Sequence, residues 1–362
     1  MELTLENISK IVDGETHIAE TTLTLRPGTV NVLLGPTLAG KTSLMRLMAG
    51  LDQPSGGRIL VDGRDVTGLP VSKRNVAMVY QQFINYPTLT VYENIASPLR
   101  VAGLAKEEIE ARVREAAKLL KLENMLSRLP LQLSGGQQQR TAIARALVKR
   151  AELVLMDEPL ANLDYKLREE LRDELPRIFA TTGAVFVYAT TEPSEALLLS
   201  GNTVALFEGR VAQFGRTTEL YHRPASLVTA RVFSDPPLNR VEATKVHGDL
   251  RLDTGHSLPM TTALAGLPEG RYTIGFRAHH LLLDRPKSDC VMLPAIVAVS
   301  EITGSESYVH VDVGAHRWVA LAAGVRRYEP GQRIDVYLEP RRLFAFAADG
   351  RIAAIADQAM AA

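Results

Sequence analysis

Residues 35–42 constrain this chain more than any other part of its sequence. They match in full the P-loop pattern of two glycines at fixed spacing followed by a lysine and a hydroxyl residue. A short apolar run over residues 30–34 precedes them and a helical apolar pattern follows, which is the strand, loop and helix context that the pattern requires. Backbone N–H groups of such a loop, with the next helix N-terminus, cradle phosphate oxygens. The predicted phosphate-binding residues are Gly35, Pro36, Thr37, Leu38, Ala39, Gly40, Lys41, Thr42 and Ser43.

Two polar side chains of this loop and two later carboxylates are predicted to share the chemistry. Lys41 would neutralise the β- and γ-phosphates, and the Thr42 hydroxyl would be a ligand of Mg²⁺. The apolar run of residues 153–156 ends in Asp157 and Glu158, which places Asp157 at a strand tip, where it can hold Mg²⁺ directly or through water. Glu158 is the expected base that polarises the attacking water.

The apolar patterning changes character along the chain. Over roughly the first 230 residues, short buried-strand patterns alternate with helical stripes such as Ile109, Val113 and Ala117, which predicts an α/β domain with a parallel sheet. A second helical stripe is Leu167, Leu171 and Leu175. After residues 235–237, segments such as 308–313 alternate with period two between glycine and proline turns, which predicts a small all-β barrel or sandwich.

Composition excludes several classes of protein. The 41 basic and 41 acidic residues cancel, which argues against nucleic-acid binding through a broadly basic surface. A single cysteine, Cys290, excludes an internal disulfide framework and suits a reducing compartment. No apolar run reaches the ~18 residues needed to span a bilayer, and the first residues do not have a signal-peptide pattern. We expect a cytoplasmic protein that reaches a membrane only through partners.

A third motif identifies a family. The sequence Leu-Ser-Gly-Gly-Gln over residues 133–137 resembles the signature motif of ABC-type ATPases. The order of motifs is similar too: P-loop, Gln81, signature, Asp157 with Glu158, and then Asp164. Residues 91–95 and the C-terminal β segments resemble the ATPases of carbohydrate and polyol importers. This resemblance implies a nucleotide-binding domain over residues 1–234, with a helical subdomain at about 88–150, and an OB-like regulatory domain over 235–362.

The resemblance also implies roles and partners. Two ATPase subunits would meet head to tail and enclose MgATP, Gln81 would contact Mg²⁺ and the attacking water, and Asp164 would lie at the dimer interface. Two transmembrane permease subunits would hold the ATPases at the cytoplasmic face of the membrane, and an extracytoplasmic solute-binding protein would deliver the cargo. No nucleic-acid partner is implied. The residues that would cap the γ-phosphate bound to the other subunit are Ser134, Gly135, Gly136 and Gln137.

Three positions depart from the family pattern. Thr191 stands where the family has a histidine, and a threonine can donate one hydrogen bond but carries no charge. Removal of one preorganised donor can lower a rate by about 10²–10³, unless Thr190 or a shifted loop replaces it. Val12 stands where an aromatic residue would stack on adenine, and Leu38 replaces a glycine, which restricts the backbone.

These departures leave two arrangements open. One is a homodimeric ATPase that tolerates the substitutions, and the other is a heterodimer with two unequal sites, in which this chain could be a partner of low turnover. Residues 190–199 resemble the paired, non-identical ATPases of bacterial glycerol importers, which favours the heterodimer. A soluble ABC ATPase of DNA repair or translation is less favoured. The chain has one P-loop, and the interval from Gln81 to Ser134 is too short for a coiled coil.

Overall fold

The computed structural model describes residues 1–82, 84–160, 166, 168–169, 171–172, 175–176 and 183–355. The chain divides into two compact units, Met1–Thr218 and Glu219–Ala362, and each is described by itself. Over the described residues, no helix has both the length and the apolar character that a membrane span requires.

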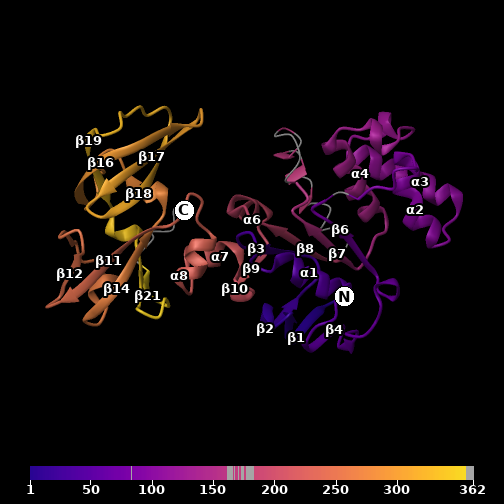
Figure 1. The fold of residues 1–362 in the computed structure, drawn as a ribbon, viewed down its shortest axis with the longest axis horizontal. Coiled ribbons are helices and arrows are strands. Elements are labelled where there is room, and N and C mark those ends of the chain that lie inside the picture. The colour runs from indigo at the N-terminus through magenta and orange to yellow at the C-terminus, as the bar shows by residue number, and fades with distance from the viewer. Residues whose placement is uncertain are drawn as a thin grey trace. The chain divides into compact units, whose positions relative to one another are not determined.

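A six-stranded, mainly parallel sheet forms the centre of the first unit (Figure 1). Four neighbouring pairs are parallel: β9 with β3, β3 with β8, β8 with β7, and β7 with β6. Only β10 runs antiparallel to its neighbour, β9. Every residue of β3, β7 and β8 is buried, as expected for strands covered on both faces. The strands predicted over residues 30–34 and 153–156 are therefore confirmed. In sheet order the strands are β10 (Arg210–Arg216), β9 (Asn202–Phe207), β3 (Val30–Leu34), β8 (Val185–Thr190), β7 (Leu153–Asp157) and β6 (Val76–Val79).

An antiparallel sheet shares the apolar core of this unit. Its strands, in order, are β2 (Glu15–Leu25), β1 (Leu3–Val12), β4 (Gly56–Val61) and β5 (Arg64–Asp65). The β1–β2 hairpin turns at Asp13 and Gly14, which have φ of 51° and 84°, the left-handed pair that a tight two-residue hairpin requires. Val12 is therefore the last residue before an exposed hairpin tip.

Helices cover the sheets and form a separate cluster. α1 (Lys41–Ala49) starts inside the P-loop, and α6 (Pro193–Leu199) follows β8. The helices α2 (Val91–Val101), α3 (Lys106–Leu119) and α4 (Gly135–Val148) contact one another, and α4 also contacts β6 (Figure 1). The predicted stripe of Ile109, Val113 and Ala117 is buried in α3. Of the second predicted stripe, Leu171 and Leu175 are helical and buried, and Leu167 lies outside the described residues.

Short elements complete the first unit and lead to the second. Three 3₁₀ turns lie between the larger elements of the first unit, and α7 lies across the division between the units. These elements are η1 (Val71–Lys73), η2 (Glu123–Met125), η3 (Pro130–Gln132), α7 (Thr217–His222) and α8 (Leu227–Val232).

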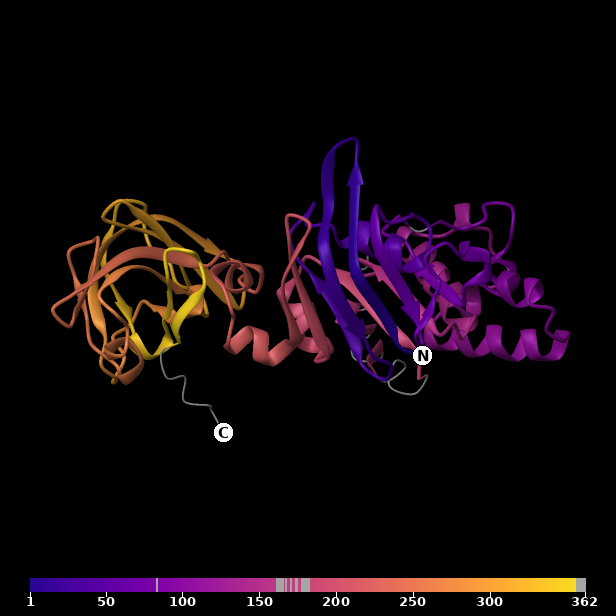
Figure 2. The ribbon, with the colours of Figure 1, turned by 90° about the horizontal axis from the view of Figure 1, so that it is seen from below.

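The second unit is a barrel-like pair of antiparallel sheets around one core, as the period-two pattern predicts (Figure 2). Trp318, the only tryptophan of the chain, lies in that core and donates a hydrogen bond to the Arg240 carbonyl. The first sheet orders β13 (Ser257–Leu258), β12 (Asp249–Leu252), β11 (Asn239–Val246), β14 (Gly270–Phe276), β20 (Phe344–Phe346) and β21 (Ile352–Ile355). The second orders β15 (Leu281–Leu282), β19 (Arg333–Leu338), β16 (Val291–Ile302), β17 (Glu306–Val313) and β18 (His316–Ala323). The short helices are α9 (Thr262–Ala265), η4 (Ala278–His280) and η5 (Pro340–Arg342).

Candidate active site

The P-loop and the ends of β7 and β8 meet at one edge of the parallel sheet. The P-loop follows β3, Glu158 follows β7, and Thr191 follows β8, which lies between these two strands. Ligands of open parallel sheets bind at this edge, outside the carboxyl ends of the strands. The sheet order therefore brings together motifs that are more than 150 residues apart in the sequence.

Gly40 gives the P-loop its shape. Its φ is 97°, and a Cβ atom there would lie 2.8 Å from Cδ1 of Ile18. Both facts favour glycine, because other residues are strained in the left-handed backbone and the Ile18 side chain would have to shift to accept a Cβ atom. The backbone therefore turns sharply enough to start α1 at Lys41, with its first N–H groups facing the loop.

Lys41 is buried at the mouth of this loop. Its Nζ donates hydrogen bonds to the carbonyl oxygens of Gly35 at 2.9 Å and Pro36 at 3.1 Å. Burial lowers the pKa of the Lys41 ammonium, while the Glu158 carboxylate, 3.6 Å away, acts in the opposite direction. The charge that would meet the phosphates is thus held inside the loop by two carbonyls and one carboxylate.

Thr42 and Asp157 form the second contact of the site. The Thr42 hydroxyl donates a hydrogen bond of 2.7 Å to Oδ2 of Asp157, as their predicted common role requires. Asp157 is only 3% exposed, and this burial raises the pKa of its carboxyl group. A buried carboxylate beside a hydroxyl group fits Mg²⁺, which prefers hard oxygen ligands and would compensate the buried negative charge.

Glu158 lies between Lys41 and Gln81. Its Oε2 accepts a 3.1 Å hydrogen bond from Nε2 of Gln81, and its backbone N–H donates to the Ala189 carbonyl at 3.0 Å. The backbone of Glu158 has φ of 45°, which is uncommon outside glycine and is found at functional sites. The structure therefore brings the predicted base, Glu158, into contact with both Lys41 and Gln81.

The signature residues lie at a second, separate helix N-terminus. Ser134 caps α4: its hydroxyl accepts from the Gln137 N–H at 3.4 Å, and its own N–H donates to the Gln137 side chain at 3.0 Å. Gly135 and Gly136 form the first turn, and Ser134 and Gly135 are exposed at the helix N-terminus. Among the described residues, no hydrogen bond joins these residues to the P-loop of the same chain. Asp164, the predicted interface residue, lies outside the described residues.

The three departures from the family pattern are all at or near the surface. Thr191 is exposed, whereas the hydroxyl of Thr190 is buried and donates to Glu195 at 2.6 Å, so the Thr190 hydroxyl is already engaged. Val12 is exposed at the hairpin tip. Leu38 is 94% exposed and has φ of 67°, the conformation for which a glycine would be suited.

One cluster of charged side chains beside Thr191 belongs to none of the sequence motifs. Arg172 contacts the carboxylates of Glu192 and Glu195 at 3.0 and 3.4 Å, and Glu195 also accepts from the Tyr188 hydroxyl at 3.0 Å. Arg172 belongs to no motif, so the sequence carries no signal for its role. The one sequence feature that could have pointed to this cluster is Glu195, which belongs to the Glu-Ala pair that follows Thr191.

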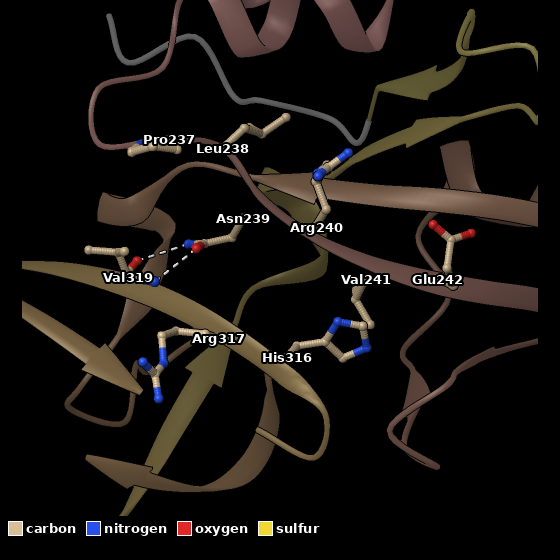
Figure 3. Close-up of a pocket in the computed structure, with 9 residues that line it drawn as sticks. All are labelled: Pro237, Leu238, Asn239, Arg240, Val241, Glu242, His316, Arg317 and Val319. Carbon is tan, nitrogen blue, oxygen red and sulfur yellow. Dashed lines mark hydrogen bonds between the residues drawn. The ribbon is translucent and has the colours of Figure 1, made fainter. Parts of the chain in front are cut away.

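The second unit has a pocket of 390 Å³ between β11 and β18 (Figure 3). Its polar groups are mostly paired: His316 with Asp253 at 2.8 Å, and Arg317 with Asp312 at 2.8 Å. Figure 3 shows the side chains of Arg240 and Arg317 pointing in different directions. The pocket therefore lacks a converging set of charges, unlike the P-loop edge.

Comparison with known proteins gives two sequence families. The family described as ABC transporter matches residues 18–161, which include the P-loop, the signature motif and Glu158. The family described as TOBE domain matches residues 274–346, in the second unit. Among solved structures, the ATP-binding cassette MJ0796, in a dimeric post-hydrolysis state bound to ADP and Pi, is 28% identical with a TM-score of 0.55. The match covers 59% of this chain and 98% of MJ0796.

Relatives with assigned names match over most of the chain. An uncharacterised ABC transporter ATP-binding protein, YcjV of Escherichia coli, is 32% identical over 97% of this chain and 99% of its own. The sn-glycerol-3-phosphate import ATP-binding protein UgpC 3 of Rhizobium etli is 38% identical over 87% of this chain and 88% of its own. The Fe(3+) ions import ATP-binding protein FbpC of the same species is 40% identical over 73% and 76%.

Proposed function

Because this chain belongs to the family of ABC transporter ATP-binding proteins, we propose that it drives a bacterial importer of a carbohydrate or polyol, with a glycerol-type solute as the specific cargo. The observation that carries the enzymatic part is the contact of Glu158 with both Lys41 and Gln81, beside the Thr42–Asp157 pair. The cargo is supported by the resemblance of residues 190–199 to glycerol importers and by the name of the relative UgpC 3.

The contacts of the site support a proposed task for each residue during ATP hydrolysis. Lys41 leaves the Gly35 and Pro36 carbonyls to neutralise the β- and γ-phosphates, and the α1 N-terminus supplies N–H donors. Glu158 orients a water for attack on the γ-phosphorus, and the bond to the bridging oxygen breaks to give ADP and phosphate. Thr42, Asp157 and Gln81 are the residues that would hold Mg²⁺, which neutralises phosphate charge when bound.

The signature residues complete a site on another subunit. Ser134, Gly135 and Gly136 present an exposed helix N-terminus that has no hydrogen bond to the P-loop among the described residues. A γ-phosphate bound by a second ATPase would supply the missing anion. Nucleotide would then close the pair, and hydrolysis would release it and move two permease subunits at the cytoplasmic face of the membrane. A solute-binding protein would deliver the cargo from outside.

The second ATPase is proposed to be a non-identical chain. This chain's own nucleotide site departs from the family pattern at three exposed residues, Thr191, Val12 and Leu38. A partner ATPase with the usual residues would therefore give one ordinary and one altered composite site. A homodimer is the competing arrangement, and it would contain two altered sites.

Reconstitution tests these statements together. The chain is reconstituted with the permease subunits, either as the only ATPase or together with a candidate second ATPase, in liposomes loaded with MgATP and supplied with the solute-binding protein and labelled glycerol. ATP-dependent glycerol uptake that needs both ATPases is the expected result. Uptake with this chain as the only ATPase would overturn the heterodimer, uptake of another solute only would overturn the cargo, and no ATP hydrolysis in any mixture would overturn the enzymatic assignment.

A further inference from the structure

We infer that Arg172 is a positioning residue of the ATPase site, which fixes the segment that carries Thr191 through Glu192 and Glu195. This inference rests on the proposed function of Thr191 beside the γ-phosphate. The helix that contains Arg172 is described in part, at residues 166, 168–169, 171–172 and 175–176, and Arg172 itself is among the described residues.

The end of β8 is bonded to both halves of the nucleotide site. The Thr190 carbonyl accepts a 3.4 Å hydrogen bond from the Gly35 N–H, at the start of the P-loop. The Ala189 carbonyl accepts from the Glu158 N–H at 3.0 Å. The P-loop and the base are thus fixed to the backbone of β8 itself, so a displacement of the segment that follows Thr190 would move Thr191 relative to both.

Glu195 holds the end of β8 through two hydrogen bonds. It is 5% exposed, and its Oε2 accepts hydrogen bonds from the Thr190 hydroxyl at 2.6 Å and the Tyr188 hydroxyl at 3.0 Å. Its other oxygen, Oε1, lies 3.4 Å from Nη2 of Arg172. A buried carboxylate is stable only when it is paired and hydrogen-bonded, so the arginine charge is required for this anchor.

Glu192 anchors the segment from the other side of Thr191. Its backbone N–H donates to the Thr190 hydroxyl at 3.0 Å, and its Oε2 lies 3.0 Å from the same Nη2 of Arg172. Arg168 adds a weaker contact at 3.5 Å. The Arg172 guanidinium group thus holds both residues that flank Thr191. It contacts Glu192 directly and holds Thr190 through Glu195.

Arg172 is suited to this task by its shape. Its side chain is 13% exposed, and its two terminal nitrogens contact three carboxylates, including Glu169 at 2.6 Å. A planar guanidinium group has several donors in fixed directions, whereas a lysine ammonium group is a single point of charge. A lysine at position 172 would keep the charge but lose part of this geometry.

Thr191 depends on this anchor more than a histidine would. The structure shows no hydrogen bond of its own side chain to other described residues, so its position follows from Thr190 and Glu192. A threonine hydroxyl is shorter than an imidazole, so the backbone must approach the γ-phosphate more closely. A misplacement of about 1 Å can cost roughly 100-fold in rate.

The test is a double-mutant cycle on the full chain in its active complex. Arg172→Met is expected to lower kcat roughly 10- to 100-fold and to change the KM for MgATP less than about twofold. In the Thr191→Ala background, the same substitution should lower kcat by less than about threefold, because the positioned hydroxyl is already gone. Arg172→Lys should recover part of kcat. Arg112→Met removes an exposed ion pair with Glu108 in α3 and is the control.

Each other outcome has a definite meaning. Equal losses of kcat in both backgrounds, or a loss that appears only in KM, would overturn the positioning role. If Arg172→Met does not fold, Glu192→Gln removes the half-exposed partner and is tested in the same cycle. Glu192→Gln with wild-type kcat would also overturn the role. An inactive wild-type complex would instead refute the proposed function, so the two failures are distinguishable.

Discussion

The Glu158 carboxylate and the Gln81 amide are joined by a 3.1 Å hydrogen bond, although 77 residues separate them in the sequence. Glu158 also lies 3.6 Å from the Lys41 ammonium. The carboxylate proposed to activate water is therefore held by Gln81 on one side and by Lys41, the proposed phosphate ligand, on the other. Movement of either neighbour towards bound nucleotide would free the carboxylate for water.

The first prediction concerns Glu158→Gln. The variant should bind MgATP within about twofold of the wild type, because the amide keeps the shape and can still hydrogen-bond to Gln81. Its turnover should fall roughly 10²–10⁴-fold, because an amide cannot act as a general base. Steady-state phosphate release and nucleotide titration measure the two effects. Glu152→Gln, at the opposite end of β7, is the matched control. Normal hydrolysis by Glu158→Gln would remove the assignment.

The second prediction concerns Lys41→Ala. A charged hydrogen bond contributes about 1.5–3 kcal/mol, so loss of the ammonium should weaken MgATP binding roughly 10- to 100-fold. Isothermal titration calorimetry of the full chain measures this change. Lys73→Ala alters an exposed lysine in η1 of the same unit and should leave affinity unchanged. Equal affinity of Lys41→Ala and wild type would contradict the assignment of Lys41.

Much of this site could be predicted because its motifs combine local chemistry with a fixed strand, loop and helix order. The P-loop, Asp157, Glu158 and the apolar strands β3, β7 and β8 follow from short patterns that need no knowledge of distant contacts. Ser134 is similar, because a hydroxyl followed three residues later by a glutamine is a helix-capping pattern.

The rest depends on tertiary packing. No local pattern could predict that Gln81 reaches Glu158, or that Thr190 turns its hydroxyl to buried Glu195 and so leaves Thr191 without a neighbouring donor. Arg172 is one of several arginines in a charged stretch of the sequence until the fold brings it beside Glu192. Side chains that act through a network carry no sequence signal, because their role depends on where the partner elements pack.

The third prediction concerns the left-handed backbone of Leu38. A left-handed conformation costs an ordinary residue about 1–2 kcal/mol, and glycine loses roughly 0.5–1 kcal/mol of unfolded-state freedom. Leu38→Gly should therefore raise the free energy of unfolding of the nucleotide-free chain by up to about 1.5 kcal/mol, measured by urea denaturation. Leu131→Gly is the control, since Leu131 is also exposed but lies outside the positive-φ residues, and it should be destabilising. Destabilisation by both variants would show that Leu38 is not strained.

The fourth prediction concerns Thr191→His. An imidazole reaches farther than a hydroxyl and can carry charge, so it should add a donor to the γ-phosphate and raise turnover in the assembled transporter. The expected rise is at least threefold, a small part of the 10²–10³ that one preorganised donor can supply. Steady-state ATPase measurements on the reconstituted complex provide the test. The control Thr191→Asn introduces a donor of intermediate length. A fall in turnover with histidine would mean that the surrounding loop is adapted to threonine.

The last prediction concerns the acid stability of the second unit. His280 in η4 is buried, and burial, with the nearby charges of His279, Arg277 and Arg342, lowers its pKa to about 2. The unfolded chain has the ordinary histidine pKa near 6.5, so below that pH it takes up a proton that the folded unit does not. His280 should therefore lower the free energy of unfolding by about 1.4 kcal/mol for each pH unit below 6.5, in addition to the effect of His279, whose pKa burial lowers to about 4, and His280→Phe should reduce the total slope by the His280 share. The emission wavelength of Trp318 follows the second unit selectively, because this is the chain's only tryptophan. With the exposed His247→Asn as control, equal slopes for wild type and His280→Phe between pH 6.5 and 4.5 would show that His280 is not the group responsible.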